Sequence, residues 1–153
     1  IALEPFPANF ELAKKNIELN NLTDKIELIQ AGCASKSGKI FIDSTISGSD
    51  SILSNVTDGF EVSLLSLDDI VKTYHIDSGI SKIDCEGCER DVILNSSKNS
   101  LQKFSQLFIE YHYGYRDLKS KLIESEFSLK ITRPWWNPLF TSNMQLGDII
   151  ATR

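Results

Sequence analysis

Residues 82–89 read KIDCEGCE, and this stretch decides the fold. The apolar residues before it predict a strand over residues 80–84, and residues 89–95 predict a helix with an acidic first turn. Strand, polar turn and helix in this order are typical of open α/β sheets, whose ligand sites lie off the carboxyl ends of the strands. We therefore expect a ligand site at the turn that contains Asp84 and Glu86.

Two other predicted strands also end on acidic side chains. Glu4 follows the apolar residues 1–3, and the strand predicted over residues 107–111 carries Glu110 and leads into His112. Glu110 and His112 are two residues apart, so both are expected on one side of the sheet. Carboxylates at several strand ends suit a ligand with a ribose diol and a positive charge.

The remainder of the chain predicts strands that alternate with helices. Helices are expected over residues 8–19, 66–74, 89–95 and 116–125, further strands over residues 25–31, 39–43, 61–65, 127–132 and 148–152, and a polar loop over residues 45–59. This alternation predicts an α/β fold with a mainly parallel sheet. The last two strands have no helix between them and predict an antiparallel pair. No domain boundary is evident, so residues 1–153 are expected to form a single domain.

Composition limits the class of partner. The chain has 153 residues and a net charge of -5, with 6 basic and 12 acidic residues in positions 1–81, and 10 and 9 in positions 82–153. Neither part is basic enough to favour a nucleic-acid partner. No apolar run approaches the ~20 residues of a membrane span. Three cysteines favour a reducing compartment over a disulfide scaffold, so a cytoplasmic location is expected.

Five segments, in order, resemble the FkbM-type methyltransferase domain. The first segment combines EP (4–5), NF (9–10) and NIELN (16–20), and the other four are AGCASKSG (31–38), LSLDD (65–69), KIDCEGCE (82–89) and IEYH (109–112). The segment KIDCEGCE is similar to the family's KIDVEGAE. The resemblance implies a Rossmann-like class I methyltransferase fold, a three-layer sandwich that binds S-adenosylmethionine. The family's first strand and Gly-rich loop precede the Glu-Pro segment, and no G-x-G occurs here. We therefore expect an N-terminally truncated methyltransferase domain with the first strand missing.

The resemblance also assigns cofactor-binding residues. It places the ribose hydroxyls at Glu4, the methyl donor near Asp84, and the adenine near Gly32 and Cys33. The alternative for Glu4 is an exposed glutamate ahead of a turn. The alternative for Asp84 is an N-cap for the helix that follows.

Three residues are candidates for the chemical step. His112 or Glu86 would take a proton from a hydroxyl acceptor, and Asp84 would face the reacting side of the site. The alternative for His112 is a hydrogen-bonded, half-buried histidine. Glu89 is expected to interact with the positive end of its helix.

Cys85 and Cys88 form a C-x-x-C motif at the junction of strand and helix. This position is typical of thiol redox proteins. The resembling family has small or apolar residues at both positions, and so we expect the two cysteines to behave as small hydrophobes. With only two histidines and no second C-x-x-C, we expect no metal site.

The function predicted from the sequence is methyl transfer from S-adenosylmethionine to an oxygen of a small molecule or glycan. One alternative is a non-catalytic fragment that acts as a binding or interaction module. Its exposed strand edges would favour a homo-oligomer. A less favoured alternative is a thiol redox protein that uses Cys85 and Cys88. Trp135 and Trp136 are expected to cover the edge of the sheet.

Overall fold

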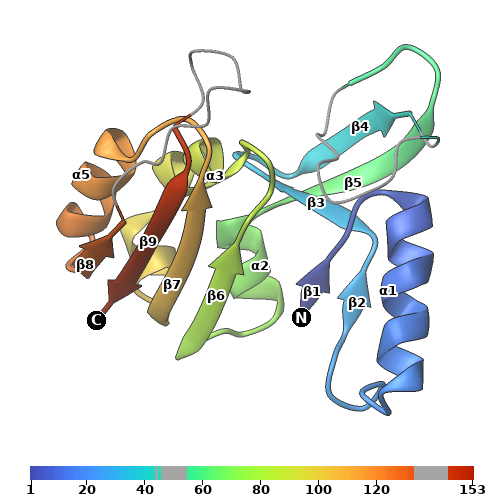
Figure 1. The fold of residues 1–153 in the computed structure, drawn as a ribbon, viewed down its shortest axis with the longest axis horizontal. Coiled ribbons are helices and arrows are strands. Elements are labelled where there is room, and N and C mark those ends of the chain that lie inside the picture. The colour runs from blue at the N-terminus through green and yellow to red at the C-terminus, as the bar shows by residue number, and fades with distance from the viewer. Residues whose placement is uncertain (44, 46–54, 133–144) are drawn as a thin grey trace. The chain divides into compact units, whose positions relative to one another are not determined.

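The computed structural model describes residues 1–43, 45, 55–132 and 145–153. These residues form two compact units, Ile1–Leu65 and Ser66–Arg153. Figure 1 shows strands and helices in both units. The expectation of a single domain stays a prediction.

The first unit contains a small β-α-β arrangement. Strand β1 (Ala2–Leu3) pairs in parallel with β2 (Leu28–Ile29), and helix α1 (Pro7–Leu19) connects them. Pro7 occupies the first turn of α1, where its missing N–H removes no helical hydrogen bond. The helix ends at the predicted asparagines, and Asn21 has a φ of 54° in the left-handed region.

The same unit holds a second sheet with the strand order β3-β5-β4. Its strands are β3 (Ala31–Ala34), β4 (Gly38–Ile42) and β5 (Phe60–Ser66). Strands β4 and β5 are antiparallel. Phe6, Ile42 and Val62 form a buried apolar cluster against which Ile40 packs.

The second unit is built on a four-stranded sheet with the order β6-β7-β9-β8. Its elements in chain order are α2 (Leu67–Thr73), β6 (Gly79–Ile83), α3 (Glu89–Asn95), α4 (Lys98–Leu101), β7 (Phe104–Tyr111), α5 (Arg116–Glu124), β8 (Ser128–Ile131) and β9 (Gly147–Thr152). Strands β6 and β7 are parallel, and β9 runs antiparallel to both β7 and β8. Helices α3 and α5 contact each other, α3 contacts β7, and α5 contacts β8.

The core of this unit comes from the apolar stripes of the two helices and from the sheet. Leu118 and Leu122 of α5 are four residues apart and are buried, as are Val92 and Ile93 of α3. The strand residues buried in this unit include Leu107, Ile109, Ile149 and Ala151. Residues four apart lie on one face of a helix, and this periodicity is why α5 could be predicted from the sequence.

Hydroxyl caps set the starts of two short helices. Ser66 Oγ accepts a hydrogen bond from the backbone of Asp69 at 3.1 Å, which confirms the predicted N-cap of α2. Ser97 Oγ accepts one from Ser100 at the start of α4. Asp68 accepts a hydrogen bond from the backbone N–H of Ser97, and this bond ties α2 to α4.

Several expectations need correction. The strand expected over residues 25–31 is divided into β2 and β3, because the chain changes partner from β1 to β5. Helix α4 was not predicted; it is a single turn without a periodic apolar pattern. The sheets are mixed rather than mainly parallel, because β4 and β5 run antiparallel and β9 runs against both of its neighbours. Trp135, Trp136 and most of the loop expected over 45–59 lie outside the described residues.

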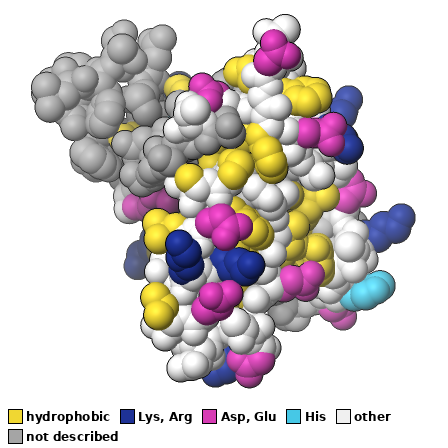
Figure 2. Space-filling model, turned by 90° about the vertical axis from the view of Figure 1, so that its right-hand side faces the viewer, with side chains coloured by type: hydrophobic (Ala, Val, Ile, Leu, Met, Phe, Trp, Pro, Cys, Tyr) yellow, Lys and Arg dark blue, Asp and Glu magenta, His cyan; other side chains and the backbone are white. Residues whose placement is uncertain are grey.

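The described surface carries charges of both signs beside exposed apolar side chains. Figure 2 shows acidic, basic and apolar groups interspersed on one face of the molecule. Exposed apolar residues include Leu12 and Leu19 on α1 and Ile80 on β6. Among the described helices, none combines the length and the apolar character needed to cross a membrane.

Candidate functional site

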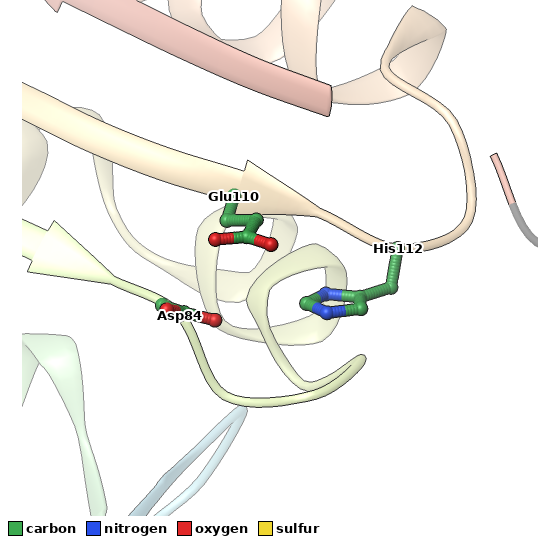
Figure 3. Close-up of side chains that lie close together, drawn as sticks. All are labelled: Asp84, Glu110 and His112. Carbon is green, nitrogen blue, oxygen red and sulfur yellow. The ribbon is translucent and has the colours of Figure 1, made fainter. Parts of the chain in front are cut away.

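The carboxyl ends of β6 and β7 bring three side chains together. Ile83 at the end of β6 lies beside Ile109 of β7, so the residues that follow them, Asp84 and Glu110, are neighbours across the parallel pair. One donor atom each from Asp84, Glu110 and His112 lie within 4.8 Å of one another. Figure 3 shows Asp84 and the His112 ring directed toward the space beneath Glu110. The prediction that Glu110 and His112 share a side of the sheet is confirmed.

The turn after β6 has an unusual backbone. Glu86 has a φ of 54° and Gly87 a φ of 111°, so two successive residues lie in the left-handed region. A Cβ at Gly87 would also lie 2.7 Å from the ring of Tyr113, but that side chain is exposed and can move, so the backbone conformation is the main reason for glycine here. The disulfide between Cys85 and Cys88 closes this turn.

Glu89 holds His112 in place. Its side chain is buried, at 1% exposure. Oε1 accepts a hydrogen bond from the backbone N–H of His112 at 2.8 Å and lies 3.1 Å from Nδ1 of the same residue. Oε2 accepts from the backbone N–H of Gly87 at 2.9 Å. A carboxylate is an acceptor only, so this contact places a proton on Nδ1 of His112, while Nε2 lies beside Glu86.

The charges around His112 favour its protonated form. The hydrogen bond to Glu89 raises the pKa of His112 against the opposing effect of burial, and the charges of Glu89, Glu86 and Glu110 raise it further. Nε2 lies 3.1 Å from Oε2 of Glu86. Burial alone would raise the pKa of Glu89, but its hydrogen bonds outweigh burial and lower that pKa. The group therefore consists of an imidazole between two carboxylates.

Asp84 also has a cationic neighbour. The Nζ atom of Lys82 forms an ion pair with Oδ2 of Asp84, and the Lys82 side chain is 69% exposed. An ion pair this open to solvent contributes about 0–1 kcal/mol. Asp84 can therefore exchange Lys82 for another cation at little cost.

The remaining predicted residues belong to the first unit. Glu4 follows β1, and its Oε1 accepts a hydrogen bond from the backbone N–H of Phe6 at 2.8 Å. Gly32 and Cys33 lie in β3. Burial raises the pKa of the Cys33 thiol to about 11. The approach of Glu4, Gly32 and Cys33 to Asp84 in one cofactor site stays a prediction.

The structure corrects three readings of the turn. Asp84 is not the N-cap of α3, because that position is taken by Cys88. Glu89 was expected to interact mainly with the helix end, whereas it is buried against His112. The two cysteines expected as small hydrophobes form a disulfide, because the turn brings their Cα atoms to 5.4 Å. The sequence signal for Glu89 was an acidic residue on the buried side of α3, in line with Val92 and Ile93.

Comparison with known proteins identifies the family. The family model described as the methyltransferase FkbM domain matches residues 1–132. A search of curated proteins and a search of solved structures each returned no significant match. The match covers most of the chain and includes both β6 and β7, which carry the cluster. The chain therefore belongs to the FkbM methyltransferase family.

Proposed function

We propose that the protein transfers a methyl group from S-adenosylmethionine to a hydroxyl oxygen of a small molecule or glycan. The observation that carries this proposal is the pair formed by Glu86 and the buried His112 at the ends of parallel strands. Family membership supports methyl transfer in general. The residues of the cluster support an oxygen acceptor in particular, because an alcohol must lose a proton as it is methylated.

The residues present fit the chemistry of S-adenosylmethionine. This cofactor has a ribose diol and two positive charges, and it supplies a methyl group activated by the sulfonium when bound. The carboxylate of Glu4 lies just beyond β1, where it accepts a hydrogen bond from the backbone N–H of Phe6. A carboxylate at this position can accept hydrogen bonds from the two ribose hydroxyls. Asp84 offers a carboxylate at the end of β6 that already pairs with a cation. We assign Glu4 to the ribose and Asp84 to the positively charged part of the cofactor.

His112 and Glu86 form the proton acceptor of the proposed reaction. Glu89 holds the ring through Nδ1, and Nε2 lies 3.1 Å from Oε2 of Glu86. The hydroxyl proton of the acceptor would pass to Glu86, whose Oε2 lies 3.1 Å from Nε2 of His112, while the methyl group would move from the sulfonium sulfur to the acceptor oxygen. The main task of the protein is to align the two reacting atoms, since holding reactants in a near-attack geometry can remove about 7–11 kcal/mol of a barrier.

A transfer assay tests this proposal. Wild-type protein is incubated with S-adenosylmethionine and a panel of sugars and polyols, and formation of S-adenosylhomocysteine is measured. The proposal predicts acceptor-dependent product, with a rate in Glu86→Gln lower by about 100-fold. Equal rates in wild type and Glu86→Gln would remove Glu86 from the reaction.

The disulfide favours one second candidate, a thiol oxidoreductase. In that reaction an incoming thiolate attacks Sγ of Cys85 or Cys88, the bond between the two sulfur atoms breaks, and a second thiol completes the exchange. Turnover of a disulfide substrate in the presence of a dithiol reductant tests it. A Cys85→Ser/Cys88→Ser variant with unchanged turnover would exclude it.

A further inference from the structure

We propose that Asp84, Glu110 and His112 bind a divalent transition-metal ion. The three residues supply two carboxylate oxygens and one imidazole nitrogen from adjacent strand ends, within 4.8 Å of one another. Figure 3 shows these side chains around a common space. This site goes beyond methyl transfer, and it revises the expectation that the sequence holds no metal site.

His112 is oriented as a metal ligand. Its side chain is 5% exposed, so the ring has little freedom to turn away. Nδ1 is engaged by the buried carboxylate of Glu89 at 3.1 Å, which leaves Nε2 as the ring nitrogen that can bind an ion. A carboxylate that holds the second nitrogen of a histidine is the usual support of a metal-bound imidazole. Glu89 therefore acts as a positioning residue for the site.

The spacing of the donor atoms fits one ion after small side-chain rotations. Metal–oxygen and metal–nitrogen bonds are about 2.0–2.2 Å long, so two ligands of one ion are at most about 4.4 Å apart. The observed limit of 4.8 Å exceeds this by a few tenths of an ångström. Glu86 Oε2 lies 3.1 Å from Nε2, so its carboxylate lies beside the proposed ion without being one of its three ligands.

Charge also favours a cation at this position. Asp84, Glu86, Glu89 and Glu110 lie at or beside the cluster, and Lys82 forms an ion pair with Oδ2 of Asp84. Lys82 is exposed, and so an ion can displace its ammonium group into solvent. The two carboxylates of Asp84 and Glu110 would neutralise the two charges of the ion.

The donor set selects the kind of ion. Imidazole suits zinc and other late transition metals better than it suits the hard magnesium and calcium ions, which prefer oxygen ligands alone, and the two carboxylates also suit manganese. We expect Mn²⁺, Co²⁺ and Zn²⁺ to bind more tightly than Mg²⁺ or Ca²⁺. A role in catalysis rests on the proposed function and changes two of its assignments, because Asp84 and Nε2 of His112 are occupied by the ion. The ion would then hold the acceptor oxygen and lower the pKa of its hydroxyl, and Glu86 would take the proton.

Titration with Mn²⁺ tests binding without any assay of activity. Binding is measured as the decrease in the electron paramagnetic resonance signal of free Mn²⁺. Wild-type protein should bind one equivalent. Asp84→Asn and Glu110→Gln should each weaken binding by about tenfold or more. Glu124→Gln removes the same charge from the exposed face of α5 and should leave binding within about twofold, since it lies on a solvated surface.

Circular dichroism spectra must first show that the variants fold, and conservative replacements at exposed or half-buried positions favour this. Equal Mn²⁺ affinity in wild type, Asp84→Asn and Glu110→Gln would overturn the proposal, as would the absence of saturable binding to wild type. Binding that Mg²⁺ displaces as readily as Zn²⁺ would overturn the assignment of His112 as a ligand. These results are independent of methyl transfer: a protein that binds Mn²⁺ but transfers no methyl group contradicts only the proposed function.

Discussion

Glu89 and His112 are joined twice, although 23 residues separate them. Oε1 of Glu89 accepts a hydrogen bond from the backbone of His112 at 2.8 Å and also lies 3.1 Å from its ring nitrogen Nδ1. One buried carboxylate thus sets both the end of β7 and the direction of the imidazole. This pair links α3 to the sheet and determines which nitrogen of His112 reaches the cluster.

Loss of this carboxylate should destabilise the protein. Glu89→Ala leaves the backbone N–H of His112, its ring and the N–H of Gly87 without their acceptor. Breaking a buried charged pair costs about 3–5 kcal/mol, so the free energy of unfolding in urea should fall by about 3 kcal/mol. The exposed Glu124→Ala serves as control and should change it by less than about 0.5 kcal/mol. A loss as small as that of the control would show that Glu89 does not hold the end of β7.

Gly87 should not tolerate a side chain. Its φ is 111°, and a Cβ would lie 2.7 Å from the ring of Tyr113. Gly87→Ala should therefore lower the free energy of unfolding by about 1–3 kcal/mol. Gly38→Ala is the matched control, because a Cβ at Gly38 meets nothing within 4 Å. Chemical denaturation compares the two variants, and equal effects would contradict the strained turn.

Reduction of the disulfide should loosen the turn that carries Glu86. The bond joins residues only three positions apart, so the entropy that it removes from the unfolded chain is small. A loop of this size stabilises the folded state by about 2 kcal/mol. We expect the dithiol form, and the Cys85→Ser/Cys88→Ser variant, to melt at a lower temperature than the oxidised protein. Identical melting of oxidised and reduced protein would show that the disulfide does not stabilise the fold.

The free thiol of Cys33 should react slowly. Burial raises its pKa to about 11, and only the thiolate is nucleophilic. Alkylation by iodoacetamide at pH 8 should therefore be slower than that of glutathione by about 100-fold or more, since few molecules carry the thiolate. Mass spectrometry of the native, oxidised protein measures the rate. Denatured protein is the control, in which Cys33 should react like glutathione.

The sequence predicted those elements whose pattern is local. The apolar periodicity of α5, the N-cap Ser66 and the turn at residues 82–89 each depend on residues close in the chain, and all three are found. The division of the strand at residues 25–31 could not be predicted, because it depends on partners that lie far away in the sequence. Helix α4 was not predicted, because its four residues are too few to show an apolar periodicity.

The candidate site was predicted only in part. Asp84, Glu86 and His112 could be selected because carboxylates and imidazoles after strands are typical of α/β sites. Their distances, and the support of His112 by Glu89, depend on the packing of α3 against β7. Glu110 was recognised as a neighbour of His112 but not of Asp84, since its approach to Asp84 follows from the register of β6 and β7.

Cofactor binding tests the central claim most directly. Isothermal titration of the chain with S-adenosylhomocysteine should give one site, and Glu4→Ala should weaken it by more than about tenfold, which is 1.4 kcal/mol. Glu11→Ala is the matched control, since Glu11 is an exposed glutamate on α1, and its affinity should equal that of wild type. No heat of binding with the wild-type chain, together with an unchanged melting temperature at high ligand concentration, would contradict the account and favour a non-catalytic fragment.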